Sequence, residues 1–306
     1  MKITFLDAST MGDVSLECIG RLGLLTCWPT STREEALERV SDCEVLIINK
    51  VVVDRELIDA AKSLRLICEA ATGVNNIDLE YAASKGIPVR NVAAYSTDSV
   101  VQQTFMHLFS LLGNGPYFDE RVKNGTYSSL PTFTDVSRPF VEAAGKTIGI
   151  IGMGAIGQRT AALAQAFGCR VIAWNRTKKE VPDVTFVDKE TLLKESDIVA
   201  LHIALNNETR DFLTAKDFAL MKKSAVIVNA ARGPVVNTND LAEALKNGTI
   251  AGAALDVYDG EPPLKSDNPL LTAPNTMLLP HIGFATREAF ELRLGIVVRN
   301  VEEFVK

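Results

Sequence analysis

The chain has 306 residues, of which 47% are apolar and 23% are charged, and its formal net charge is −6. An acidic chain without a stripe of Lys and Arg is a poor candidate for binding nucleic acid or an anionic membrane. No apolar run reaches the length of a membrane span, and the length of the chain fits two domains better than one. The five scattered cysteines form no C-x-x-C pair, which predicts a reduced compartment, with the cytoplasm as the default, and no metal site.

The first part of the chain alternates short apolar runs with helical patterns. We predict strands near residues 3–6, 25–28, 45–48, 66–69 and 89–92, and helices over 33–40, 56–61 and 79–84. Continuous apolar strands between helices are typical of a parallel sheet that is covered on both faces. Residues 97–112 then predict a long helix, and residues 113–145, rich in polar residues and Pro, predict an irregular segment.

A glycine-rich motif follows this segment. The run Gly152-Met153-Gly154-Ala155-Ile156-Gly157 comes directly after the apolar run 147–151, and it precedes a helical pattern over 158–167 and a second apolar run over 171–174. In this context one glycine makes a tight turn, one lets the backbone approach a pyrophosphate, and one lets helix and strand pack closely. The phosphates bind at the helix N-terminus. The motif therefore predicts a dinucleotide site, although glycines that serve only a turn are the alternative.

The end of the second strand of this unit departs from the usual pattern. An acidic residue is expected there to bind the ribose hydroxyls, but the sequence reads Asn175-Arg176-Thr177, followed by Lys178 and Lys179. No carboxylate repels a 2′-phosphate, and the cations attract one. We therefore predict NADP(H), or tolerance of it. The alternative is a solvated basic turn whose acidic partner comes from elsewhere in the chain.

The remaining strands are predicted over 198–202, 225–229, 252–257 and 277–279, and three histidines are the candidates for acid–base chemistry. His107 lies in a helical pattern and is expected to be packed there. His202 ends a strand, where it either lines the cofactor cleft or makes a structural hydrogen bond. His281 lies between Pro280 and Gly283 after the last strand, and such an irregular turn at a carboxyl end directs an imidazole toward a ligand.

Two charged residues occupy comparable positions. Arg232 follows the strand at 225–229, and its planar guanidinium suits a carboxylate and a neighbouring oxygen. Glu261 follows the strand at 252–257, and a carboxylate beside an imidazole raises the pKa of the imidazole and fixes its tautomer. Each alone is more often a surface charge or a loop cap. Three such groups at successive strand ends of one sheet predict a catalytic site.

Several motifs occur in a fixed order: Ala71–Asp78, Tyr95–Val100, Gly145–Gly152, Asn229–Gly233, Leu255–Val257 with Glu261-Pro262, and Pro280–Gly283. With them the chain resembles the D-isomer-specific 2-hydroxyacid dehydrogenases, of the branch that contains glycerate dehydrogenase, hydroxypyruvate reductase and glyoxylate reductase. The resemblance implies an α/β fold of two doubly wound parallel-sheet domains. A Rossmann cofactor domain (residues 97–285) would be inserted in a flavodoxin-like substrate domain (residues 1–96 and 286–306), with the cleft between them.

The resemblance also implies roles. His281 would give a proton to the substrate carbonyl oxygen as hydride reaches C2, Glu261 would hold the proton of His281, and Arg232 would bind the substrate carboxylate and carbonyl oxygen. Backbone N–H groups around Gly73 and Val74 would hold the substrate carboxylate from the other domain. The coenzyme would lie against Thr97, Gly152, Gly154, Ala155, Ile156, Gly157, Asn175, Arg176, Thr177, Ala204, Ala230, Ala231 and Asp256.

Some expectations stay open at this stage. Ala204 replaces a proline that many relatives have, which leaves the shape of the adenosine pocket undetermined. The substrate would be a small 2-oxo or 2-hydroxy acid, with hydroxypyruvate or glyoxylate reduction expected and no metal involved. A phosphoglycerate dehydrogenase-like enzyme and a non-catalytic dinucleotide-sensing protein are the alternatives. In relatives the segment 97–145 packs against its two-fold mate, which predicts a homodimer.

Overall fold

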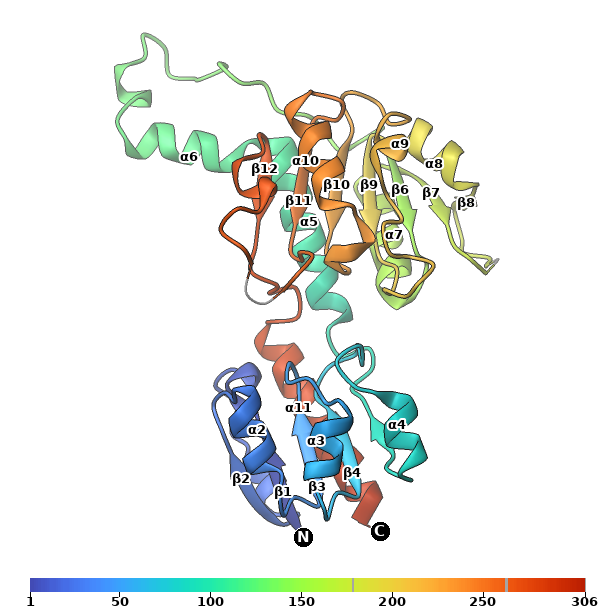
Figure 1. Cartoon of the computed structure of the whole chain (residues 1–306). Coiled ribbons are helices and arrows are strands. Elements are labelled where there is room, and N and C mark those ends of the chain that lie inside the picture. The colour runs from blue at the N-terminus through green and yellow to red at the C-terminus, as the bar shows by residue number, and fades with distance from the viewer. Residues whose placement is uncertain (178, 262–263, 306) are drawn as a thin grey trace. The chain divides into compact units, whose positions relative to one another are not determined.

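The computed structural model describes residues 1–177, 179–261 and 264–305. They form two compact units, one of Met1–Ser96 with the residues from Phe284 onward, and one of Thr97–Gly283. The sequence placed the corresponding boundaries after residues 96 and 285. We refer to them as unit 1 and unit 2, and Figure 1 shows the chain coloured by residue number.

Unit 1 is built on a parallel sheet with the strand order β2-β1-β3-β4-β5. Its strands are β1 (Lys2–Phe5), β2 (Leu24–Cys27), β3 (Val45–Ile48), β4 (Leu66–Glu69) and β5 (Val89–Arg90). Its helices are η1 (Ala8–Met11), α1 (Glu17–Gly20), α2 (Arg33–Arg39), α3 (Arg55–Ala60), α4 (Leu79–Ser84) and α11 (Arg287–Val305). This is the flavodoxin-like order, in which the strand order reverses between β1 and β3 while all strands run parallel. The predicted fold of this part is confirmed.

Local sequence signals explain the helices of unit 1. Thr32 and Glu35 form a reciprocal capping box at the start of α2, and Asp54 and Asp78 cap α3 and α4 with their side chains. Every residue of β3 and β4 is buried, because apolar clusters cover both faces of the sheet. Continuous apolar strands of this kind are typical of central parallel strands.

Unit 2 has a parallel sheet with the order β12-β11-β10-β9-β6-β7-β8. Its strands are β6 (Thr147–Ile151), β7 (Arg170–Trp174), β8 (Val184–Phe186), β9 (Ile198–Leu201), β10 (Val226–Asn229), β11 (Gly252–Leu255) and β12 (Thr276–Leu278). Its helices are α5 (Thr97–Gly113), α6 (Gly115–Lys123), η2 (Tyr127–Ser129), α7 (Ala155–Ala166), α8 (Lys189–Glu195), α9 (Ala215–Phe218), η3 (Gly233–Val235), α10 (Thr238–Lys246) and η4 (Pro269–Thr272). The order reverses between β6 and β9, so unit 2 is the predicted Rossmann fold.

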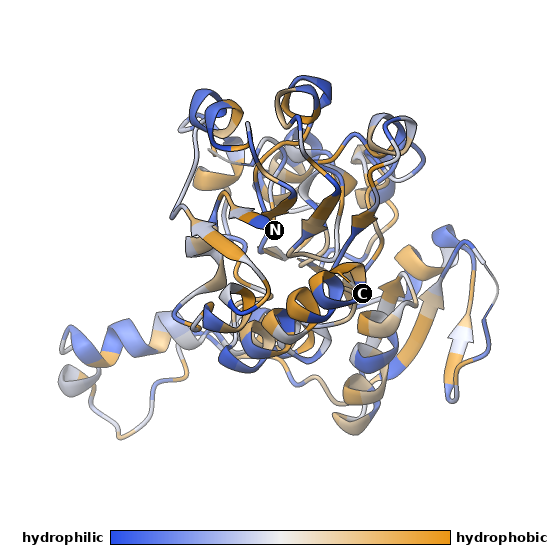
Figure 2. Cartoon of the chain, turned by 90° about the horizontal axis from the view of Figure 1, so that it is seen from below, coloured by the Kyte–Doolittle hydropathy of each residue, from blue (hydrophilic) through white to orange (hydrophobic). Residues whose placement is uncertain are grey.

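Two apolar clusters cover the faces of this sheet. One packs α8, α9 and α10 against it, and the other packs α5 and α7. In Figure 2 the strands are mostly orange, whereas the helices carry both blue and orange residues. In the described part of the chain, no helix has the length and apolar character needed to cross a membrane.

The expected irregular segment 113–145 is only partly irregular, because α6 and η2 lie within it. The run Gly113-Asn114-Gly115-Pro116 is typical of a segment that ends a helix. However, Asn114 adopts a left-handed φ of 51° and Pro116 lies in the first turn of α6, where its missing N–H costs nothing. We call residues 114–141 the arm. It projects away from the sheet of unit 2 (Figure 1).

Candidate active site

Three neighbouring strands of unit 2 deliver the predicted catalytic side chains to one edge of the sheet. Arg232 follows β10, Glu261 follows β11 and His281 follows β12, and these strands are adjacent in the order β12-β11-β10. Because all strands of the sheet are parallel, their carboxyl ends share one edge. This is the edge at which open α/β sheets bind ligands.

His281 and Glu261 form the centre of this arrangement. Nδ1 of His281 donates to Oε2 of Glu261 at 2.6 Å, and both side chains are mostly buried. Oε1 of Glu261 accepts the backbone N–H of Tyr258. The Tyr258 hydroxyl in turn donates to the backbone carbonyl of Leu279, at 2.9 Å, two residues before His281. The carboxylate is thus fixed at both oxygens, and it fixes the tautomer of the imidazole.

The backbone of His281 is held in an unusual conformation. Its φ is 55°, in the left-handed region that non-glycine residues seldom adopt. The carboxylate of Asp256 accepts the next two backbone N–H groups, from Ile282 at 2.8 Å and Gly283 at 2.7 Å. Ser99 of α5 donates to the carbonyl of Gly283 at 2.6 Å. The sequence assigned Asp256 to the coenzyme, and in the structure its carboxylate binds the His281 loop.

Arg232 lies in a turn that is tied to the same loops. Asn229 accepts from the backbone N–H of Ala231 and donates to the carbonyl of Arg232, so its amide closes the turn. A side chain at Gly233 would overlap the backbone of Tyr258 and Asp259. The Arg232 turn therefore packs directly on the segment that leads to Glu261. This close approach explains why glycine follows the arginine.

The glycine motif has the geometry of a phosphate cradle. Gly152 has a φ of 100°, and a Cβ there would lie 2.5 Å from the carbonyl oxygen of His202. A Cβ at Gly157 would overlap the backbone of Gly152. The absence of a side chain at Gly157 therefore lets α7 pack closely against the turn after β6. Gly154 has open space around it and precedes the first turn of α7. The residues present therefore fit a pyrophosphate at this helix N-terminus.

The turn after β7 is more structured than its sequence indicates. Asn175 accepts the backbone N–H of Met153 at 3.0 Å and donates to the carbonyl of Thr177 at 2.7 Å. Lys179 donates to the carbonyl of Met153 at 2.8 Å, which places a cation beside the glycine motif. Lys178 lies outside the described residues.

Arg176 pairs with a residue that the sequence analysis did not single out. Its Nη1 lies 2.9 Å from Oε2 of Glu208, and the two side chains are 73% and 71% exposed. Glu208 belongs to the loop after β9, which also contains Ala204. The carbonyl of Ala204 accepts the hydroxyl of Thr209 at 2.7 Å. Only the fold brings positions 176 and 208 together, so no local signal indicates the pair.

Of the other two histidines, His107 is fully buried and His202 is half-buried. His202 hydrogen-bonds with Oγ1 of Thr160 at 3.1 Å, and burial lowers the pKa of His202 to about 4. His107 is fully buried on α5 near Asp256, and burial lowers its pKa too. Of the two roles expected for His202, the structural hydrogen bond is the one that the structure contains. Neither imidazole is in a state suited to holding a proton at neutral pH.

The remaining predicted residues lie in the segments expected for them. Gly73 and Val74 are half-buried in the loop after β4 of unit 1. Thr97 begins α5, Ala230 and Ala231 follow β10, and Ala155 and Ile156 form the first turn of α7. Pro262 of the Glu261-Pro262 motif is outside the described residues.

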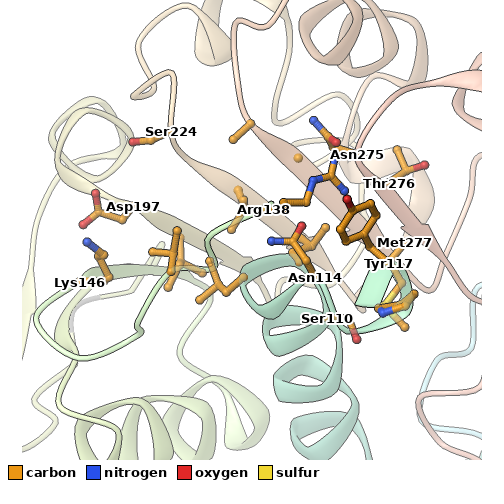
Figure 3. Close-up of a pocket in the computed structure, with 18 residues that line it drawn as sticks. Ser110, Asn114, Tyr117, Arg138, Lys146, Asp197, Ser224, Asn275, Thr276 and Met277 are labelled. Atoms are coloured by element: carbon orange, nitrogen blue, oxygen red, sulfur yellow. The ribbon is translucent and has the colours of Figure 1, made fainter. Parts of the chain in front are cut away.

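A cavity of about 620 Å³ lies at the opposite edge of the unit 2 sheet (Figure 3). It is lined by the residues that begin β9 to β12 and by the arm, including Asn114, Tyr117, Arg138, Asn275 and Thr276. Since it is at the amino edge of the strands, it is separate from the catalytic groups of unit 2.

Comparisons with known proteins show the family to which the chain belongs. Residues 105–283 match the family model described as the D-isomer specific 2-hydroxyacid dehydrogenase, NAD binding domain. The chain is 36% identical to a hydroxypyruvate reductase of Blautia hydrogenotrophica, over 100% of this chain and 97% of that protein. It is 38% identical to a glyoxylate reductase of Thermococcus litoralis, over 88% of this chain and 83% of that protein.

Among solved structures, an acyclic imino acid reductase in complex with NADPH and D-Arg superposes with a TM-score of 0.91. It is 31% identical, and the match covers 100% of this chain and 97% of that one. The match over full length agrees with the order of motifs in the sequence and with both sheet topologies. The chain belongs to the D-isomer specific 2-hydroxyacid dehydrogenases, in the branch of the glycerate dehydrogenases and hydroxypyruvate reductases, and is an NAD(P)-dependent oxidoreductase.

Proposed function

We propose that the protein reduces hydroxypyruvate or glyoxylate to the corresponding 2-hydroxy acid. The observation that carries this proposal is the 2.6 Å hydrogen bond between His281 and Glu261 at the strand edge that also carries Arg232. The names of relatives such as the hydroxypyruvate reductase and the glyoxylate reductase support the substrate class.

The chain supplies the polar chemistry of this reduction. With Nδ1 bonded to Glu261, His281 gives its Nε2 proton to the carbonyl oxygen of the substrate, and Glu261 stabilises the imidazolium before the transfer. Arg232 binds the substrate carboxylate and stabilises negative charge on the carbonyl oxygen. Backbone N–H groups around Gly73 and Val74 add to carboxylate binding. The nicotinamide coenzyme, when bound, supplies the hydride.

The coenzyme is held by the glycine motif and by the turn after β7. Backbone N–H groups of Ala155 and Ile156 would hold the pyrophosphate beyond Gly154, and Asn175, Arg176 and Thr177 would hold the adenosine ribose. Thr97, Ala230, Ala231 and Asp256 would border the nicotinamide side, and Ala204 would border the adenosine. The turn contributes no carboxylate of its own and carries Arg176 and Lys179, which favours NADPH over NADH although Glu208 pairs with Arg176.

A panel of oxo acids tests the assignment. Glyoxylate, hydroxypyruvate, pyruvate and phenylpyruvate are each reduced with NADPH and with NADH, and kcat/KM is compared. We expect the first two to give the highest values. A phosphoglycerate dehydrogenase-like activity and a non-catalytic sensor are not favoured. With 3-phosphohydroxypyruvate as a fifth acid, turnover of that acid alone would support the first, and turnover of none of the five would support the second.

The arm supports a homodimer. Its apolar side chains are unusually exposed, with Phe133 91%, Val136 75% and Phe140 66% accessible. Met106, Phe109 and Phe167 add a further exposed apolar group on α5 and α7, and the aromatic rings of Phe109 and Phe167 lie 4.9 Å apart. Exposed apolar side chains gathered in this way mark an interaction surface, and a second copy covers it with the symmetry that most oligomers use.

A reducing compartment, the cytoplasm, fits the cysteines. The structure describes all five as free thiols, and burial raises the pKa of Cys43 to about 11 and that of Cys68 to about 12. Such thiols stay protonated and unreactive at neutral pH. A cell fractionation experiment tests this localisation.

A further inference from the structure

The carboxyl edge of the unit 1 sheet carries a buried polar cluster that the proposed reaction does not use. It consists of the buried Asp7 after β1, Asn49 after β3, Glu69 at the end of β4 and Arg293 of α11, together with the half-buried Asn76 in the loop after β4. The strand order reverses between β1 and β3, and ligands of doubly wound sheets bind outside the carboxyl ends at such a point. The loop after β3, residues 49–53, is therefore the segment of unit 1 that is placed to meet a substrate.

Asp7 fixes the first half of this loop through the loop's backbone N–H groups. Its carboxylate accepts three successive backbone N–H groups, from Asn49 at 3.0 Å, Lys50 at 2.5 Å and Val51 at 3.2 Å. Three N–H donors that converge on one carboxylate fix the direction in which the chain leaves β3.

Asn76 holds the second half of the loop. Its side-chain Nδ2 donates to the backbone carbonyl of Val51 at 2.9 Å, and its backbone carbonyl accepts the N–H of Val53 at 2.8 Å. Asn76 thus joins the loop after β3 to the loop after β4, the one that contains Gly73 and Val74. Val51 and Val53 are at least partly buried, and Val52 between them is exposed.

Glu69 in turn holds Asn76. Oε2 of Glu69 accepts the second proton of Asn76 Nδ2 at 3.0 Å, and the Glu69 side chain is 0% exposed. Among the described residues, Oε1 of Glu69 has no hydrogen-bond partner. Burying a carboxyl group at the end of an apolar strand is costly unless the group is hydrogen-bonded. Here the hydrogen bond of Glu69 orients the amide of Asn76.

We propose that Glu69 and Asn76 are positioning residues of the substrate loop, and that they set the affinity for the 2-oxo acid by fixing residues 50–53. This inference rests on the proposed function, since it assigns that loop to the same substrate. It adds two residues that touch neither the reacting atoms nor the coenzyme, and it predicts effects on KM rather than on kcat.

Glu69 acts in this pair as a neutral acid. Burial, together with charge repulsion from Asp7, raises the pKa of Glu69 to about 9, although the hydrogen bond from Asn76 and the charges of Lys50 and Arg293 act in the opposite direction. The titratable groups that face Glu69 are thus Asp7 after β1, Lys50 in the loop after β3, Arg293 of α11 and the Tyr95 hydroxyl. Above pH 9 the ionised carboxylate faces the carboxylate of Asp7, which loosens the loop.

Steady-state kinetics with glyoxylate and hydroxypyruvate at saturating coenzyme test the proposal. We expect Asn76→Ala to raise the substrate KM roughly tenfold, as for one to two lost hydrogen bonds, while kcat and the coenzyme KM change less than about threefold. Asn300→Ala is the matched control, because Asn300 is also half-buried in unit 1 and donates to a backbone carbonyl, that of Asn91 at 3.0 Å. An unchanged KM in Asn76→Ala overturns the proposal.

Glu69→Gln tests whether Glu69 acts as a protonated, neutral acid or as a charged carboxylate. We expect this variant to keep the wild-type KM at pH 7 and to lose the rise in KM that the wild type shows above pH 9. Glu44→Gln, at the amino edge of the same sheet, controls for loss of a carboxylate. A tenfold rise in KM at pH 7 in Glu69→Gln, with no further change at alkaline pH, contradicts the neutral acid.

Amide hydrogen exchange gives a reading that needs no substrate. In the intact protein, exchange at Val51 and Val53 accelerates in Asn76→Ala and stays unchanged in Asn300→Ala if Asn76 fixes the loop. Equal exchange in all three proteins overturns the positioning role. If no oxo acid is turned over by the wild type while exchange behaves as expected, the proposed function fails and the loop anchor stands.

Discussion

Nδ1 of His281 lies 2.6 Å from Oε2 of Glu261, and this contact joins the loops after two adjacent parallel strands. The imidazole therefore has a fixed tautomer before any substrate binds. We predict that His281→Ala lowers kcat by about 10²–10⁴-fold, the usual worth of a general acid. Coenzyme Kd stays within a factor of about two, because the imidazole meets the substrate oxygen and not the dinucleotide. Stopped-flow hydride transfer and fluorescence titration measure the two quantities. Wild-type turnover in the variant would exclude the assignment.

Glu261→Gln tests the second member of the pair. The amide keeps the size of the side chain but removes the charge that stabilises the imidazolium. It also puts an NH2 group in place of one of the two oxygens that accept hydrogen bonds from His281 and Tyr258. We expect kcat for reduction to fall by about 10-fold or more, as for a charge-assisted hydrogen bond. Asp259→Asn is the control, since Asp259 is an exposed acid of the same loop. Equal loss in both variants would point to disruption of the loop instead.

The sequence predicts much of this site because its signals are local. The run 45–48 and the apolar residues 66–68 match β3 and β4, and the residues after β10, β11 and β12 converge because parallel strands share an edge. Helix α6 escaped prediction because Gly115-Pro116 signals a break and also starts a helix.

The partners of these residues were harder to predict. Glu208 meets Arg176 across 32 positions, and Asn76 meets Val51 across 25. Such pairs depend on the packing of whole loops and leave no spacing that a sequence pattern detects. Glu69 had one local signal, a carboxylate at the end of a wholly apolar run. That signal indicates burial, but it does not name Asn76.

Coenzyme preference depends on Arg176. A 2′-phosphate carries nearly two charges, so it outcompetes the exposed Glu208, whose pair with Arg176 is worth about 0–1 kcal/mol. We expect NADPH to be used at least as well as NADH, and Arg176→Ala to weaken NADPH binding by about 1.5–3 kcal/mol while NADH binding barely changes. Asn175→Asp shifts preference toward NADH by repelling the phosphate. Kd values for both coenzymes from fluorescence titration measure these effects.

Two further variants sharpen the coenzyme experiment. Glu208→Gln removes the negative charge that pairs with Arg176. We expect it to raise the affinity for NADPH and to leave the affinity for NADH unchanged. Arg210→Ala removes an exposed arginine from the same loop and controls for net charge. A strong NADH preference of the wild type that survives Arg176→Ala would end this interpretation.

Assembly depends on the exposed apolar residues of the arm. We predict a homodimer at micromolar concentration, and we predict that Phe133→Glu with Phe140→Glu yields a monomer of 33.2 kDa. A carboxylate in an apolar interface costs several kcal/mol when it lacks a partner. Light scattering gives the mass, and Leu24→Glu, which changes an exposed apolar residue of β2, is the control. A monomeric wild type would refute the prediction.

The buried histidines make stability depend on pH. Burial lowers the pKa of His202 from 6.5 to about 4, and the pKa of His107 is lowered for the same reason. Between those values the unfolded chain binds a proton that the folded chain does not, so stability is full above about pH 6.5 and falls as the pH drops toward 4. His202 alone accounts for at most about 3 kcal/mol of this loss.

The variant His202→Gln isolates that contribution. Glutamine does not titrate, and its amide has a donor and an acceptor for the hydroxyl of Thr160, which bonds His202 at 3.1 Å. We expect urea midpoints of the variant to decline less than those of the wild type between pH 7 and pH 4.5, while carboxylates contribute equally to both proteins. Parallel declines would mean that His202 takes up its proton in the folded state, against its burial beside Thr160. A smaller decline in the variant identifies the neutral imidazole as an acid-labile element of the Rossmann unit, next to the glycine turn that Gly152 forms against the His202 carbonyl.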